Sequence, residues 1–152
     1  MGIVVHEISH SLGFSKTTFE RFNLLKQKHG KLYIHSHQLM EWGRKYFNCP
    51  TLEMLPLEDD GGEGTAGSHW ERLTFGDEAM TGTDVAVFYY SQFTMLALES
   101  TGLYKANLNR ASFNYNWGKN AGCEAIHGSC HSSLVCDQPH SSSFCSHDHL
   151  KI

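Results

Sequence analysis

A short segment near the start of the chain combines residue types that can hold a metal ion and move a proton. His6-Glu7-Ile8-Ser9-His10 places two histidines four residues apart. On an α-helix such residues lie on one face, with their Cβ atoms roughly 5–6 Å apart. Both imidazoles can therefore bind one Zn²⁺, and the intervening Glu7 is a candidate general base beside them.

A catalytic zinc site usually has three protein ligands and leaves a fourth position for water. In the most compact arrangement a third histidine would follow His10 by six residues, but that position is Lys16. A more distant residue must then complete the site. The histidines that precede the C-terminal tail are the candidates, with one helical glutamate as an alternative: His29, His35, His37, His69 and Glu41.

The elements that must position these residues are predicted to be mainly helices. We expect a helix over residues 2–13 that ends at Gly13, and a second over residues 16–29 that begins at Ser15. The apolar spacing predicts further helices from Ser36 to Phe47 and over residues 84–101. The positions expected to face inward in these two helices are Leu39, Met40, Gly43, Phe47, Phe88, Phe93, Leu96 and Ala97.

Between and after these helices the sequence predicts shorter elements. Residues 31–34 have the pattern of a short strand, and residues 56–68 are rich in glycine, which indicates a loop with unusual backbone angles. Residues 103–121, rich in aromatic residues and asparagine, are expected to form short strands and turns. From about residue 122 the composition changes to Ser, His and Cys, which we interpret as the start of a second, disulfide-dependent region.

Composition narrows the class of protein. A chain of 152 residues, 40% hydrophobic and 18% charged, suits a globular domain. The net charge of −4, with no basic patch, argues against a nucleic-acid partner. No apolar run is long enough for a membrane span, and the first residues do not resemble a signal peptide. The clustering of cysteines towards the C-terminus favours an oxidising compartment.

Several separated motifs, in order along nearly the whole chain, resemble the leishmanolysin/invadolysin family of metzincins. Two of these motifs are the histidine segment with its continuation through Ser15, and the glycine-rich loop that leads into His69-Trp70-Glu71. The remaining motifs are Asn48-Cys49-Pro50, Glu78-Ala79-Met80-Thr81-Gly82, residues 97–107, residues 117–123 and Cys145-Ser146-His147-Asp148-His149. In this family a long insertion separates the second and third zinc histidines, which agrees with the sequence separation of 59 between His10 and His69.

The resemblance implies a role for each matching residue. His6, His10 and His69 would bind one zinc ion, Glu7 would be the general base, and Met80 would lie in a turn beneath the metal without binding it. The implied activity is that of a zinc metalloendopeptidase, in which water activated by the metal hydrolyses peptide bonds.

The resemblance also implies a fold and a cellular setting. We expect an α+β fold, mainly α, with residues 1–121 as part of a metzincin catalytic core, its lower subdomain, and residues 122–152 as the start of a Cys-rich region. The family's N-terminal subdomain, which pairs with substrate, has no counterpart here, so we expect a fragment. We further expect a monomer that acts on protein or peptide substrates, is secreted or associated with the cell surface and membrane, with a cytoplasmic alternative, and has family-level links to adhesion.

Three alternatives stay open at this point. In the first, the chain is a metzincin fragment without catalytic activity that serves as a surface, adhesion or binding module. In the second, Glu41 supplies the third ligand in place of His69. In the third, the histidines and cysteines of the tail, which lack a regular metal-binding spacing, hold a second metal ion instead of forming disulfides and a solvated loop.

Overall fold

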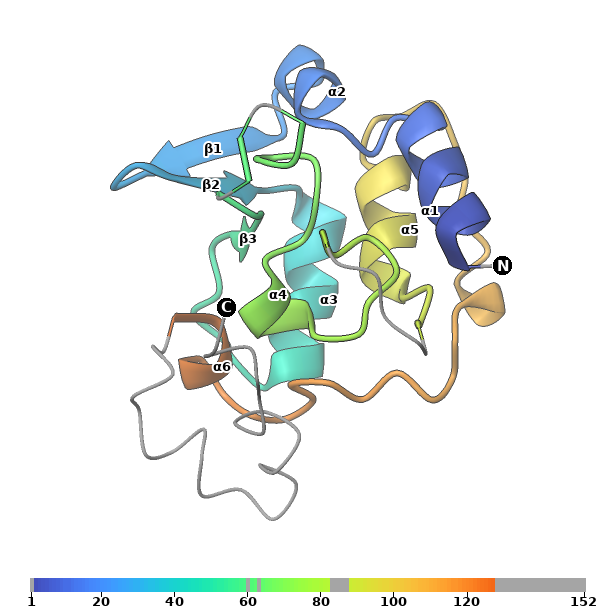
Figure 1. Cartoon of the computed structure of the whole chain (residues 1–152). Coiled ribbons are helices and arrows are strands. Elements are labelled where there is room, and N and C mark those ends of the chain that lie inside the picture. Colours follow the sequence, from blue (N-terminus) through green and yellow to red (C-terminus); the bar gives the residue numbers. More distant parts are fainter. Residues whose placement is uncertain (1, 60, 63, 83–87, 128–152) are drawn as a thin grey trace.

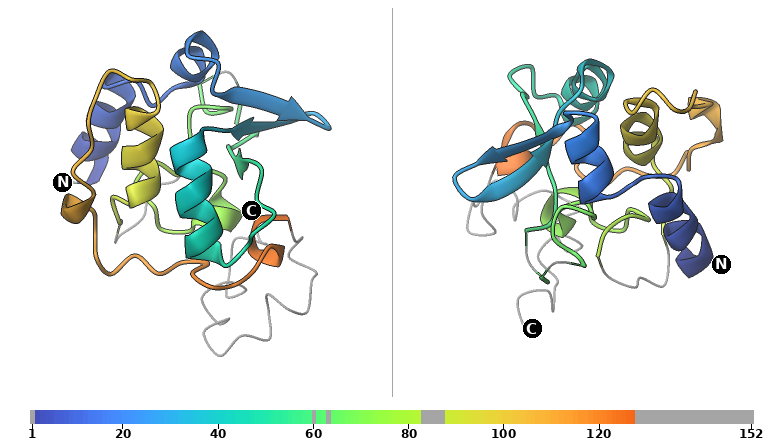
Figure 2. Two further views of the ribbon diagram at one scale, coloured as in Figure 1. Left: turned by 180° about the vertical axis from the view of Figure 1, so that it is seen from behind. Right: turned by 90° about the horizontal axis from the view of Figure 1, so that it is seen from above.

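In the computed structural model, residues 2–59, 61–62, 64–82 and 88–127 are described. Three helices form the body of the fold: α1 (Gly2–Ser11), α3 (His37–Phe47) and α5 (Gln92–Glu99). Figures 1 and 2 show α5 lying between α1 and α3, so that α1 occupies the outer side of the helical layer. Side chains of α1 bond to Ala79, Tyr90 and His69, which lie far along the chain from this helix.

A small antiparallel sheet lies beside the helices. It has the order β1 (Leu25–Lys28), β2 (Lys31–Ile34) and β3 (Leu55–Pro56), with Leu25 opposite Ile34 and Ile34 opposite Leu55. Four short helical segments complete the described part of the chain: α2 (Lys16–Arg21), α4 (Arg72–Phe75), the 3-10 helix Leu108–Arg110, and α6 (Glu124–His127). This mixture of helices and a small sheet agrees with the expected α+β class.

Two helix starts and one strand are confirmed where the sequence predicted them. Ser15 and Ser36 cap α2 and α3, because their hydroxyls accept hydrogen bonds from the amides of Thr18 and Leu39. The predicted strand 31–34 is β2. The inward positions predicted for α3 are all buried: Leu39, Met40, Gly43 and Phe47.

Three predicted elements need correction. The helix expected over residues 16–29 ends at Arg21, and residues 25–28 form β1, because they pair with β2. The helix expected over residues 84–101 begins at Gln92, after residues 88–91, while residues 84–87 lie outside the described part. Residues 103–121 contain turns and one 3-10 helix but no strand.

An aromatic core packs α5 against α3. Phe93 of α5 packs against Tyr46 and Phe47 of α3, with ring centroids 5.0 Å and 5.3 Å apart.

A disulfide between Cys49 and Cys123, whose Cα atoms lie 4.8 Å apart, links the end of α3 to the start of α6. The predicted boundary at residue 122 stays a prediction, since residues 128–152 lie outside the described part. Among the residues described, no helix has the length and apolarity needed to cross a lipid bilayer.

Candidate metal centre

The fold brings three of the predicted site residues together. The Nε2 atoms of His6 and His10 lie 3.0 Å apart, and each lies 3.2 Å from Nε2 of His69. His6 and His10 come from successive turns of α1, whereas His69 lies 59 positions after His10 in the sequence. The three nitrogens thus form a nearly equilateral triangle.

The other nitrogen of each ring faces a backbone carbonyl. His6 Nδ1 lies 2.6 Å from the Ala79 oxygen, and His10 Nδ1 lies 2.7 Å from the Phe14 oxygen. His69 Nδ1 lies 3.1 Å from the Thr65 oxygen. A carbonyl can only accept, so each Nδ1 carries the ring proton and each neutral ring presents an Nε2 lone pair.

This arrangement fits a zinc ion. Zn–N bonds of about 2.0–2.1 Å in tetrahedral geometry separate the ligand nitrogens by about 3.3–3.4 Å. The observed separations of 3.0–3.2 Å lie close to that range. Three lone pairs directed at one another repel unless a cation lies among them, and carbonyl partners on the outer nitrogens are typical of zinc-binding histidines.

His10 is oriented by the way in which α1 ends. The Phe14 amide donates to the Ser9 carbonyl and the Gly13 amide to the His10 carbonyl, each at 2.9 Å. These two bonds define a Schellman ending with Gly13 at the left-handed position, where its φ is +112°. The turn directs the Phe14 carbonyl back to His10 Nδ1. The Phe14 ring then packs on Trp70, the neighbour of His69, with centroids 5.2 Å apart.

His6 is oriented by a turn that contains the predicted methionine. The Ala79 carbonyl, which accepts from His6, belongs to residues 78–81. Met80 in this turn is fully buried, and its carbonyl accepts from the Trp70 amide at 2.8 Å. The turn therefore contacts His6 directly, and through the Met80 carbonyl it also bonds to the extended segment that follows His69.

His69 is held by the glycine-rich loop. The Glu58 amide donates to the His69 carbonyl at 2.9 Å, and the Gly67 amide donates to the Glu58 carbonyl at 2.7 Å, so the loop closes on itself. Gly67 has φ +76°, and a side chain there would meet Leu32 at 3.0 Å. His69 is mostly buried, and burial lowers the pKa of its imidazole, which favours the neutral form that binds metals.

Glu7 lies on α1 between the two helical ligands and is exposed. Its negative charge acts on His69, where it opposes the larger effect of burial on the pKa of that imidazole. The carboxylate is thus within electrostatic range of the centre and open to solvent. These are the properties that a proton acceptor beside the metal needs.

The other candidates for the third ligand lie elsewhere. His29, His35 and His37 are exposed, and the ring of His35 donates to the Glu53 carbonyl at 2.6 Å. Glu41 is exposed on α3 and accepts from Lys45 at 2.9 Å, which lowers the pKa of its carboxyl. The proposed metal site of the tail involves residues outside the described part. Within the described ranges, one further group has metal-binding spacing, the acidic trio Glu58, Asp59 and Glu71.

Sequence reasoning missed the groups that orient the ligands. The three acceptors are backbone oxygens of Phe14, Thr65 and Ala79, which carry no side-chain signature. It also gave no role to Glu78, a fully buried carboxyl in the methionine turn. The one signal was indirect: the family resemblance places Met80 in the core, and an acidic residue two positions away would require partners there.

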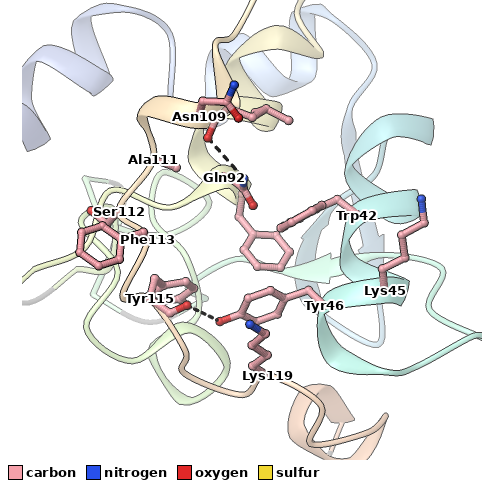
Figure 3. Close-up of a pocket in the computed structure, with 12 residues that line it drawn as sticks. Trp42, Lys45, Tyr46, Gln92, Asn109, Ala111, Ser112, Phe113, Tyr115 and Lys119 are labelled. Atoms are coloured by element: carbon pink, nitrogen blue, oxygen red, sulfur yellow. Dashed lines mark hydrogen bonds between the residues drawn. The ribbon is translucent and has the colours of Figure 1, made fainter.

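A separate cavity of about 450 Å³ contains none of the predicted site residues. It lies between α3, α5 and the segment 108–119, with Trp42, Tyr46 and Tyr115 among its aromatic walls and Lys45 and Lys119 at its edge (Figure 3). The Tyr46 hydroxyl donates to the Tyr115 carbonyl at 3.3 Å across its floor. The candidate metal centre therefore lies away from this hollow.

Comparison with known proteins gives a consistent result. A sequence model of the family described as Leishmanolysin matches residues 1–152. The chain is 37% identical over 134 residues to a leishmanolysin homolog of Crithidia fasciculata, covering 84% of the chain and 20% of that protein. It is 35% identical over 144 residues to leishmanolysin of Leishmania major, covering 90% and 24% respectively.

A relative from an animal shows the same pattern. The chain is 32% identical over 171 aligned residues to a leishmanolysin-like peptidase of Drosophila melanogaster, covering 84% of the chain and 25% of that protein. The chain thus spans about a fifth to a quarter of the length of these relatives. The family resemblance seen in the motifs is confirmed.

Proposed function

Because the chain belongs to the leishmanolysin family of peptidases, we propose that it carries the zinc-binding core of a metalloendopeptidase that hydrolyses peptide bonds within proteins. The observation that carries the proposal is the triangle of Nε2 atoms from His6, His10 and His69, each ring fixed by a carbonyl. A zinc ion bound there supplies a Lewis acid that lowers the pKa of water and polarises the scissile carbonyl.

We assign the other roles in this reaction to residues of the chain. The three imidazoles hold the ion in their neutral form, and their carbonyl partners keep them in that tautomer. A carboxylate oxygen of Glu7 accepts the proton of the attacking water and delivers it to the leaving amine nitrogen. Met80 supports the turn beneath the centre through its buried side chain and does not bind the metal.

Zinc analysis and a peptide-cleavage assay test this proposal together. We expect one zinc ion per chain, and cleavage that a chelator abolishes and added zinc restores. Glu7→Gln should keep the zinc and lose roughly 10²–10⁴-fold in turnover, the usual contribution of a general base. Glu20→Gln, which changes an exposed acid on α2, is the matched control and should retain full turnover. Undiminished turnover in Glu7→Gln would show that another group accepts the proton.

A second candidate function has one observation in its favour. On α1 the apolar residues Ile3, Val4 and Ile8 are each more than half exposed beside the metal ligands. Such a face can bind a protein surface without cleaving it, as expected of a non-catalytic binding module. The same assay separates the two functions, because a wild-type chain that holds zinc but cleaves no peptide is the result expected of the module.

The Cys49–Cys123 disulfide supports a setting outside the reducing cytoplasm. We therefore propose a secreted or cell-surface protein that acts on protein or peptide substrates. A monomeric state, membrane association and a part in adhesion stay predictions from the family resemblance.

A further inference from the structure

Glu78 is a fully buried carboxyl at the first position of the turn that orients His6. Its Oε1 accepts three hydrogen bonds: from the Ser91 amide at 3.0 Å, the Ser91 hydroxyl at 2.7 Å and the Thr94 hydroxyl at 2.6 Å. Its Oε2 accepts from the Met80 amide at 2.5 Å. One side chain therefore joins the turn to the first residues of α5.

The direction of these bonds is set by the other contacts of the donors. The Thr94 oxygen accepts from Trp70 Nε1 at 2.9 Å, and the Ser91 oxygen accepts from the Phe93 amide at 3.2 Å. Both hydroxyl protons are thus left to point at Glu78, which accepts at every contact. Burial raises the pKa of Glu78, and the four donors oppose that rise.

The turn held in this way reaches the metal centre. Glu78 fixes the amide of Met80, and the carbonyl of the intervening Ala79 accepts from His6 Nδ1. A shift of the turn would move that carbonyl and release the ring of His6. The Met80 carbonyl also accepts from the amide of Trp70, which follows His69, so the same turn adjoins a second ligand.

We propose that Glu78 is a positioning residue of the zinc centre, which sets the orientation of His6 through the Ala79 carbonyl. The proposal rests on the proposed zinc-binding function. An ordinary core residue does not explain a carboxylate here, because burying its charge costs free energy that an apolar side chain would not. Only a group with two accepting oxygens satisfies the donors of α5 and the Met80 amide together.

Glu78→Gln tests this role with little change in volume. A glutamine has one accepting oxygen, so if it keeps the bonds from α5 its NH₂ group faces the Met80 amide, donor against donor. We expect zinc affinity, measured by competition with a chromogenic chelator, to fall about 10–100-fold, as for other changes to the partners of a zinc ligand. The visible absorption of the Co²⁺-substituted chain should change as well, since it reports ligand geometry.

Thr94→Val is the matched control. It removes one donor to Glu78 and the acceptor of the Trp70 ring, which lowers stability, but leaves the bond to the Met80 amide. At a similar loss of Tm, it should weaken zinc binding less than Glu78→Gln and keep the Co²⁺ spectrum. If Glu78→Gln does not fold, Glu78→Asp replaces it, because the shorter acid keeps the charge but does not reach the same donors.

The outcomes distinguish the two proposals. A wild-type chain that binds no zinc overturns the proposed function itself. A wild-type chain that binds zinc, beside a folded Glu78 variant of equal affinity and unchanged Co²⁺ spectrum, overturns the positioning role alone. Equal losses in Glu78→Gln and Thr94→Val also overturn it, since general destabilisation would then explain both.

Discussion

Replacing Gly13 by alanine should weaken zinc binding, because it should disturb the contact between the Phe14 carbonyl at the end of α1 and the ring of His10. The residue has φ +112°, a conformation that costs a non-glycine residue about 1–2 kcal/mol. The added Cβ would also lie 3.2 Å from Thr18 Cγ2. The backbone can relieve both by rotating, and this rotation moves the Phe14 carbonyl away from His10.

The expected loss of zinc affinity follows from that one contact. The Phe14 oxygen lies 2.7 Å from His10 Nδ1 and is the partner that keeps Nε2 free to bind the metal. Loss of such a partner costs about 10–100-fold in metal affinity, equivalent to about 1.4–2.8 kcal/mol. The zinc-bound chain should therefore lose more stability than the zinc-free chain.

Gly30→Ala is the control that isolates this effect. Gly30 lies in the turn between β1 and β2 with φ +82°, and an added Cβ would meet nothing within 4 Å. Urea unfolding without zinc should show losses of about 1–2 kcal/mol in both variants. Chelator competition should show weaker zinc binding for Gly13→Ala alone. Equal zinc affinities in the two variants, at equal losses of stability, would refute the link between Gly13 and His10.

Three further predictions concern other parts of the chain. His69→Ala should weaken zinc binding by more than the roughly 100-fold that loss of an outer partner costs, whereas His35→Ala, at an exposed histidine, should not; metal analysis of the purified variants checks this. Burial, and then the nearby Glu58, raise the pKa of Glu71 above its ordinary 4.5, so the folded state binds more protons and stability falls as pH rises through that window. Glu71→Gln, which keeps an acceptor for the Leu73 amide, should therefore be more stable than the wild type at neutral pH but not in acid, as denaturation at the two pH values would show. The Cys49–Cys123 disulfide spans a sequence separation of 74, so the double serine variant should lose about 4 kcal/mol of unfolding free energy in a denaturant titration.

The sequence predicted α1 and α3 because local signals agree there with the tertiary structure. In α3 the serine cap, the apolar spacing and the break at Cys49-Pro50 all point to one helix, and the structure has it from His37 to Phe47. For the site, the spacing of His6 and His10 was enough to place two rings on one face. His69 was selected through the family resemblance, because spacing alone left several histidines open.

The helix predicted over residues 16–29 ends at Arg21 for a local reason that the apolar spacing does not reveal. The Leu24 amide donates to the Phe19 carbonyl, and Asn23 adopts φ +57°, so α2 ends in a Schellman turn with asparagine in the place of glycine. Gly30, interpreted as a helix end, is instead the second residue of a two-residue hairpin turn after His29, both with positive φ. Pairing with β2 then decides the conformation of β1.

The late start of α5 has a long-range cause. The Tyr89 amide donates to the Asp77 carbonyl and its carbonyl accepts from the Ala79 amide, so this segment is held extended against the methionine turn. Ser91 then caps the helix while its hydroxyl proton is given to Glu78. Helical periodicity does not reveal a helix whose first turns are exchanged for pairing with a distant segment.

The same reasoning explains why the sequence could predict which imidazoles meet but not how each ring is oriented. Ligand identity depends on imidazole chemistry, which a sequence displays. Orientation depends on three carbonyls, and a different turn or loop positions each one. These are a Schellman turn for His10, a closed glycine-rich loop for His69, and a turn bonded to Glu78 for His6. The Schellman turn and the Glu78 turn bond to different rings, so His10 and His6 can be loosened separately. The zinc affinity lost in Gly13→Ala and in Glu78→Gln should then combine nearly additively as long as the ion itself is the sole element they share.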